Sequence, residues 1–254
     1  MRRLFWVIAV VFAAAILVTG CDDDGTGEAK TYDRTMALDN GEYQKVLDMT
    51  KNCGGDQACL MDRAAAFIGL AGFTVPKVVK AITEESDESY FQLLTKTLEP
   101  TQGKNRLDSS RTTYISVLTV RGRAINQCDQ AHYGVLNQYE KAACTNAGLA
   151  SIVKSAAIAS GIEDIMNTNP TCKTTLTLSD CNGITADDLK DLVDLLFNDS
   201  ESIVGLISAK DSDTKEEIQK IKDELCDAAG ELAGCLATAV SQDAILKWVK
   251  GYIK

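Results

Sequence analysis

The 254-residue sequence has few of the features that would point to a particular chemistry. It contains one histidine, His132, and three prolines, and aromatic residues make up 6% of the chain. It has no CxxC pair, GxSxG elbow, Walker-type phosphate loop or GxGxxG turn. The residue patterns of thiolate zinc sites, serine hydrolases and nucleotide-binding folds are therefore missing. On this basis we expect no cofactor or metal and assign no catalytic residues, although dispersed catalytic groups would leave no such motif.

Basic residues are also in short supply. The chain has 26 lysines and arginines against 36 aspartates and glutamates, a formal net charge of −10. An acidic surface repels phosphate groups, so nucleic acid is not an expected partner. It repels anionic lipid headgroups for the same reason, although acidity also serves plain solubility.

The N-terminal residues have the layout of a secretory signal. Arg2 and Arg3 precede an apolar run at residues 4–18, and the small residues Thr19 and Gly20 follow. The run is shorter than the ~20 apolar residues that a membrane-spanning helix needs. We therefore expect the segment to direct export and then to be removed.

The junction Val18-Thr19-Gly20-Cys21 resembles the lipobox of bacterial lipoproteins. This resemblance implies that Cys21 becomes the mature N-terminus, with a diacylglycerol thioether and an N-acyl chain such as palmitate. The protein would then be held by lipid on the exported, periplasmic side of a cell-envelope membrane, with inner and outer membrane both open. The alternative is an ordinary signal peptide or membrane anchor in which the cysteine is incidental.

The residues after Cys21 are strongly polar. The stretch DDDGTG has nothing to bury, so residues 21–30 are predicted to form a flexible acidic tether. Removal of residues 1–20 would leave 24 basic and 36 acidic side chains, a net charge of about −12.

The remaining cysteines indicate disulfides. Once Cys21 is set aside, an even eight remain, and an even count in an exported chain favours disulfides over metal ligation. They fall into four neighbouring couples, with five, fifteen, eight and eight residues between the partners. The predicted bonds are Cys53–Cys59, Cys128–Cys144, Cys172–Cys181 and Cys226–Cys235.

Two of these couples make local predictions. Nine steps along one helix span about 13.5 Å, whereas bonded cysteines need Cα atoms within about 7 Å. A bond between Cys226 and Cys235 therefore requires the helix to end between them, and Gly230 is the natural site for that end. The stretch between Cys172 and Cys181, KTTLTLSD, has strand-like alternation and is predicted to be a stapled loop or a small hairpin.

Elsewhere the apolar residues recur with helical spacing. This holds for ESYFQLLTKTLE, DDLKDLVDLLF and DTKEEIQKIKDEL. TNAGLASIVKSAAIASGI, at residues 145–162, is predicted to be a core helix that Lys154 interrupts. The C-terminal stretch SQDAILKWVKGYIK reads as a helix that either closes the core with Trp248 or docks on lipid. We predict an all-α, disulfide-stapled multi-helix domain with about ten to thirteen short helices.

The front of this domain has a second, weaker resemblance. Ala37, Gly41, Tyr43 and Val46, and then Gly69, Gly72 and Phe73, are similar to the centre of a tetratricopeptide repeat over residues 31–83. The resemblance implies helical hairpins turned by glycine, although the second copy departs from the pattern because Phe73 directly follows Gly72. Generic helix packing is the alternative.

These features give a predicted domain order. It comprises a signal peptide at 1–20, the tether at 21–30, a front helical segment at 31–100, a linker at 101–104 and a larger helical domain at 105–254 with three of the disulfides.

Few residues are candidates for function. Arg111, Arg121 and Arg123 could bind an anionic group or form internal ion pairs, and His132 has no evident catalytic partner in sequence. The stretch at 180–184 lacks the acidic spacing of a calcium loop, and Thr185 is better interpreted as a helix cap.

Two functions remain. The first is a protein-interaction or assembly scaffold for envelope proteins, anchored to the membrane through Cys21. The second is a ligand-binding or enzymatic lipoprotein with a cleft between the front helices and the larger core. The absence of catalytic motifs favours the scaffold.

Overall fold

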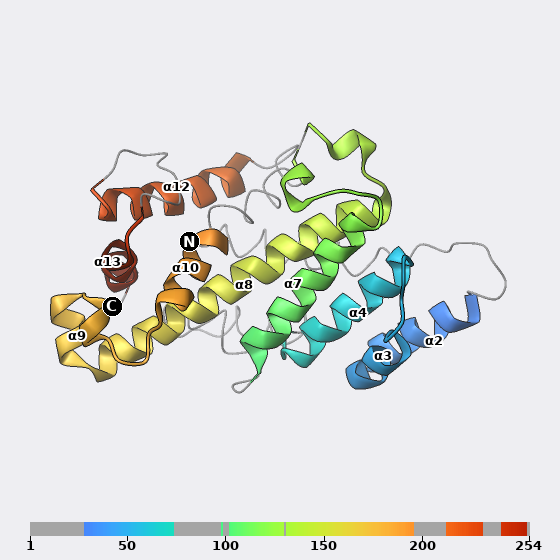
Figure 1. Ribbon diagram of the computed structural model, residues 1–254, viewed down its shortest axis with the longest axis horizontal. Coiled ribbons are helices and arrows are strands. Elements are labelled where there is room, and N and C mark those ends of the chain that lie inside the picture. The colour runs from blue at the N-terminus through green and yellow to red at the C-terminus, as the bar shows by residue number, and fades with distance from the viewer. Residues whose placement is uncertain are drawn as a thin grey trace.

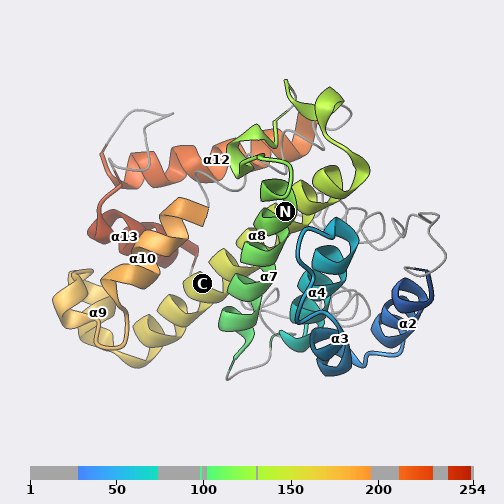
Figure 2. The ribbon, with the colours of Figure 1, turned by 45° about the vertical axis from the view of Figure 1, so that its right-hand side comes forward.

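The computed structural model describes residues 28–73, 98, 102–129, 131–195, 212–230 and 240–252. In these residues the chain forms helices and connecting turns and no strand, which confirms the predicted all-α class. Figures 1 and 2 show a long central helix with shorter helices along its sides. The predicted helix at ESYFQLLTKTLE (except Leu98), the lipobox and Cys235 lie outside the described residues.

The α-helices follow one another along the chain, with three short 3₁₀ turns between them. The α-helices are α2 (Glu28–Asp39), α3 (Tyr43–Met49), α4 (Gln57–Leu70), α7 (Gly103–Thr119), α8 (Gln138–Thr168), α9 (Pro170–Thr175), α10 (Ala186–Asp194), α12 (Ser212–Ala228) and α13 (Gln242–Tyr252). The 3₁₀ turns are η1 (Ile125–Gln127), η2 (Tyr133–Val135) and η3 (Leu178–Asp180).

Helix α8 is the predicted core helix, and it is much longer than the expected short helices. It runs for 31 residues from a capping box, in which Asn137 Oδ1 accepts from the Glu140 N–H at 2.8 Å and Glu140 Oε2 accepts from the Asn137 N–H at 2.7 Å. By length and composition α8 could cross a membrane, but 88% of its most apolar window is buried inside the protein. Its small residues let neighbouring helices approach closely, as expected for a core helix.

The front helices pack as successive hairpins. Gly41, at φ +74°, turns the chain from α2 to α3, a conformation that glycine adopts without strain. The ring of Tyr43 packs directly on Gly69 of α4, where a Cβ atom would overlap it. Ala37, Val46 and their neighbours form a small core of their own. This geometry suits a repeat-like hairpin, while the family likeness itself stays a prediction.

Two predicted boundaries differ from the helix ends. Helix α2 begins at Glu28, inside the predicted tether, because Glu-Ala-Lys is a strong helix-forming sequence and an acidic residue suits a helix N-terminus. Helix α7 begins at Gly103, inside the predicted linker. Ala64 of α4 packs in one core with α7 and α8, so the front helices are continuous with the rest of the described body.

Three of the predicted disulfides are present in the described residues: Cys53–Cys59, Cys128–Cys144 and Cys172–Cys181. Cys226 is also disulfide-bonded. Its pairing with Cys235 stays a prediction because Cys235 is not described. Helix α12 does end before Gly230, which has φ +78° as expected for a helix end.

The Cys172–Cys181 loop is helical, so the suggested hairpin is wrong. Asn169 caps α9 by accepting from the N–H groups of Thr171 and Cys172 at 3.1 and 3.2 Å. The loop therefore consists of α9 and η3, because a cap and Pro170 at the first helical position outweigh weak strand alternation.

Helices α10, α12 and α13 complete the core on α8. Leu189, Leu192 and Val193 of α10 are buried, as their periodicity predicted. Trp248 of α13 is 5% exposed and lies in the same cluster, while Lys247 and Lys250 are exposed. The structure thus bears out the core position of Trp248 rather than lipid docking.

Candidate functional site

The groups singled out as candidates lie mainly in one segment, residues 120–137, which we call the α7–α8 connection. It holds η1 and η2, and the bond between Cys128 and Cys144 ties it to α8. Gln57, at the start of α4, holds the C-terminal end of the connection at Asn137. The Gln57 side chain donates to the Val117 carbonyl at 2.8 Å and accepts from the Asn137 amide, also at 2.8 Å. The connection is therefore held from α4, α7 and α8.

The three arginines do not form one anion site. Arg111 lies within α7, whereas Arg121 and Arg123 are in the connection. The Arg121 side chain is half exposed, and its Nη1 lies 3.6 Å from Oε2 of the fully buried Glu140. For Arg121 the arrangement matches the expectation of internal ion pairing.

Glu140 is a functional candidate that the sequence did not single out. Its side chain is fully buried. Its Oε1 has no hydrogen-bond partner, and the buried Nε of Arg123 also lacks one. Unpaired buried polar atoms are unusual in proteins. The capping-box spacing Asn137-x-x-Glu140 was readable in the sequence, but the burial of the carboxylate was not.

His132 does have an acidic partner, contrary to the sequence reading. Asp129 Oδ1 lies 2.7 Å from His132 Nδ1 and accepts from the His132 backbone N–H at 2.9 Å. The hydrogen bonds from His132 lower the pKa of the Asp129 carboxyl. Both side chains are more than 40% exposed, so the pair stabilises an exposed turn.

The α7–α8 connection also exposes apolar side chains. Val120 and Val135 are 39% and 58% exposed. Arg121 and the half-exposed His132 lie in the same connection, so this disulfide-tied loop presents both apolar and polar side chains to solvent.

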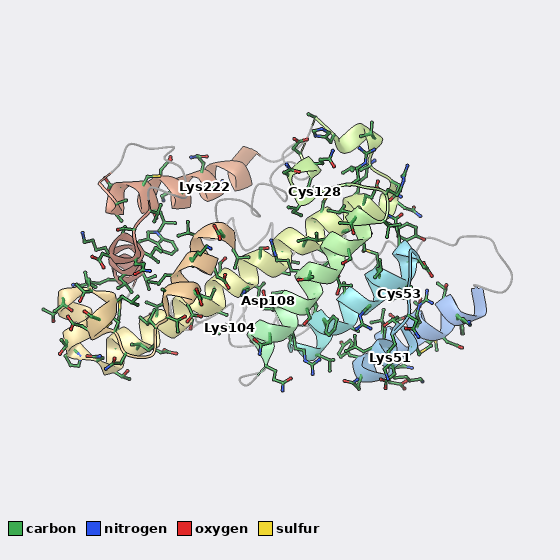
Figure 3. All side chains as sticks on the ribbon, viewed as in Figure 1. Lys51, Cys53, Lys104, Asp108, Cys128 and Lys222 are labelled. Carbon is green, nitrogen blue, oxygen red and sulfur yellow. A yellow bond between two sulfur atoms is a disulfide. The ribbon has the colours of Figure 1, made fainter. Side chains whose placement is uncertain are left out.

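Two ion-pair networks join helices of the described body. Lys154 of α8 donates to Asp108 of α7 at 2.7 Å and to Asp191 of α10 at 2.8 Å. Lys104 lies 3.7 Å from Asp188 one turn away along the same helices (Asp108 and Lys104 are labelled in Figure 3). A buried lysine needs such partners, but the sequence does not say which carboxylates supply them.

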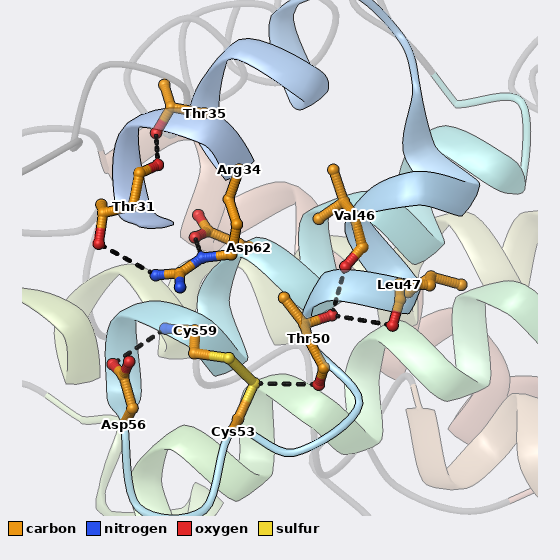
Figure 4. A network of polar contacts seen from close by, with 10 residues as sticks. All are labelled: Thr31, Arg34, Thr35, Val46, Leu47, Thr50, Cys53, Asp56, Cys59 and Asp62. Atoms are coloured by element: carbon orange, nitrogen blue, oxygen red, sulfur yellow. Dashed lines mark hydrogen bonds and ion pairs between the residues drawn. A yellow bond between two sulfur atoms is a disulfide. The ribbon is translucent and has the colours of Figure 1, made fainter. Parts of the chain in front are cut away.

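The second network joins the front helices. Arg34 Nε of α2 lies 2.6 Å from Asp62 Oδ2 of α4, and both side chains are largely buried (Figure 4). The same view shows the Cys53–Cys59 bond and Asp56, which caps α4 by accepting from the Cys59 N–H at 3.1 Å.

The described residues contain no group of three histidine, cysteine, aspartate or glutamate side chains that could hold a metal ion. A shallow hollow is lined by Gln219, Lys220, Asp223, Glu224 and Asp227 of α12.

Comparison with known proteins completes this description. No family model, no curated protein and no solved structure matches the chain.

Proposed function

We propose that the protein is an exported lipoprotein, anchored through Cys21, whose helical body serves as an interaction or assembly scaffold for envelope proteins. The disulfides support the exported location, because such bonds persist in oxidising compartments such as the periplasm. The lipobox resemblance at residues 18–21 supports the anchor.

The observation that carries the scaffold proposal is the exposed, rigid α7–α8 connection. Val120 and Val135 offer apolar contact area, and Arg121 keeps half of its side chain in solvent. A partner that presents apolar side chains flanked by carboxylates would fit this surface. Because the disulfide and Gln57 already order the loop, binding would cost little conformational entropy.

The alternative was a cleft between the front helices and the larger core. Along the described contact that space is filled, since Ala64 and Tyr114 are buried against each other's helices and Ser110 donates to the Ala64 carbonyl at 2.9 Å. We therefore do not extend the proposal to a ligand-binding or enzymatic role.

Site-specific photo-crosslinking in intact cells tests the scaffold role. A photoreactive residue at Val135 should yield a reproducible adduct with an envelope protein, and Val135→Asp in the untagged chain should weaken co-purification of that protein. The control is the same residue at Lys247, which is exposed on α13. No adduct, or the same adducts from both positions, would contradict the proposal.

The anchor is tested separately. Cys21→Ser should leave the precursor unlipidated, with residues 1–20 uncleaved or the protein released. Mass spectrometry of the mature N-terminus decides this. A native N-terminus elsewhere, without an acyl mass, would refute the anchor.

A further inference from the structure

Helix α2 exposes an apolar pair on its outward face. Tyr32 and Met36 are 65% and 43% exposed, and they lie four residues apart on the same side of the helix. These are the most exposed large apolar side chains of the described front helices.

The rest of α2 keeps this face outward. Arg34 and Ala37 lie on the opposite side of the helix and are 6% and 2% exposed. The ion pair from Arg34 to Asp62 holds that side against α4, and a hydrogen bond from Arg34 to Thr31 of the same helix orients the guanidinium (Figure 4). Tyr32 and Met36 therefore cannot turn into the core without breaking a buried ion pair.

The length of the chain before α2 suggests what covers the pair. Helix α2 begins at Glu28, seven residues after Cys21. At about 3.3–3.6 Å per residue, this chain reaches no more than about 25 Å. If Cys21 carries lipid, as proposed above, the apolar face of α2 is held close to the bilayer surface.

We propose that this face of α2 rests on the zwitterionic phospholipid interface and orients the anchored body. The inference relies on the proposed lipid anchor. Tyrosine favours the headgroup region because it has an apolar ring and a polar hydroxyl. A short tether provides an effective concentration of about millimolar, so a contact too weak to bind the free body to vesicles is populated once the body is anchored.

Charge specifies the kind of lipid. Asp33 and Asp39 are exposed on α2, and the body as a whole is acidic, so anionic headgroups would be repelled. Helices α2 and α9 lie at opposite ends of the longest axis of the molecule in Figure 1. Contact through α2 would point the α9 end away from the membrane.

Depth-dependent quenching tests the proposal. The mature lipidated protein is reconstituted into phosphatidylcholine vesicles that contain bromine-labelled lipid, with tryptophan placed at Tyr32. The buried Trp248 serves as an internal reference because the core shields it. Val135→Trp is the matched control, since it is equally anchored and exposed but lies in the α7–α8 connection.

The expected result is that emission from position 32 falls by about half or more, because interfacial side chains sit about 5–10 Å into the headgroup boundary. Emission from position 135 should change little, and added phosphatidylglycerol should reduce the quenching at 32. Flotation without quenching at 32, or equal quenching at both positions, would overturn the contact and leave the anchor intact. Failure of the protein to float with vesicles would refute the anchor and the contact together.

Discussion

Replacement of Lys154 by methionine tests how much the three-helix ion pair contributes to stability. Methionine has a similar length and keeps most of the packing of the lysine stem, whose side chain is 10% exposed. The substitution removes two charge-assisted hydrogen bonds, to Asp108 and Asp191. Bonds of this kind contribute about 1.5–3 kcal/mol in buried settings.

Solvent reduces that figure here. The two aspartate side chains are 47% and 50% exposed, so each contact is worth about 1 kcal/mol or less. Their oxygens lie 2.7 and 2.8 Å from the same nitrogen, hence no more than 5.5 Å apart, and they would repel each other once the lysine is gone. We expect Lys154→Met to lower the free energy of unfolding by about 1–2 kcal/mol at pH 7, or the Tm by about 2–8 °C.

The stability that the Lys154 ion pairs contribute should depend on pH in a specific way. Burial alone would lower the pKa of Lys154, but the hydrogen bonds to Asp108 and Asp191 outweigh it and raise the pKa above the ordinary 10.5. The stabilisation is therefore complete below about 10.5 and is lost as the pH rises through the raised value.

Urea unfolding followed by circular dichroism at pH 7 and at pH values from about 10 to 12 measures these differences. Lys247→Met, an exposed position on α13, is the control and should change stability by less than about 0.5 kcal/mol. Unchanged or increased stability of Lys154→Met at pH 7 would refute the reasoning. It would mean that the desolvation penalty of burying the lysine is at least as large as the stabilisation from its two ion pairs.

Three further predictions use the same unfolding measurement. Gly69→Ala should destabilise the protein by about 1–3 kcal/mol because its Cβ would overlap the Tyr43 ring. Gly161→Ala, with nothing near its Cβ, should stabilise it by about 0.5–1 kcal/mol, and equal effects at both sites would contradict the packing. Arg34→Met should cost about 3 kcal/mol at pH 7, because it leaves the buried Asp62 unpaired. Burial raises the pKa of Asp62, and Arg34 opposes that rise. The loss of stability in Arg34→Met should therefore become smaller toward acid pH, where the unpaired carboxyl is neutral. A loss of stability that does not depend on pH would contradict this explanation. Trp248→Ala should cost about 3–5 kcal/mol if α13 closes the core, and an unaltered Tm would place this side chain elsewhere.

Short-range features were readable from the sequence. Thr185 caps α10 as predicted, and Asp56 caps α4 in the same way, because a cap depends on residues only three positions away. The buried face of α10 follows its helical periodicity. The cysteine couples were found for a similar reason, since partners close in sequence need little help from the fold to meet. The lipid anchor at Cys21 also rests on a local motif and stays a prediction.

Contacts between residues far apart in the sequence were determined by tertiary packing. Lys154 was noted only as an interruption of an apolar helix, because its partners are 46 and 37 residues away and meet it only after α7, α8 and α10 pack together. The ion pair between Arg34 and Asp62, which are 28 residues apart, likewise forms only when α2 packs against α4. Which apolar residues stay outside, such as Tyr32 and Met36, also depended on packing, because one helix face is left in solvent only when its opposite face is covered by another helix.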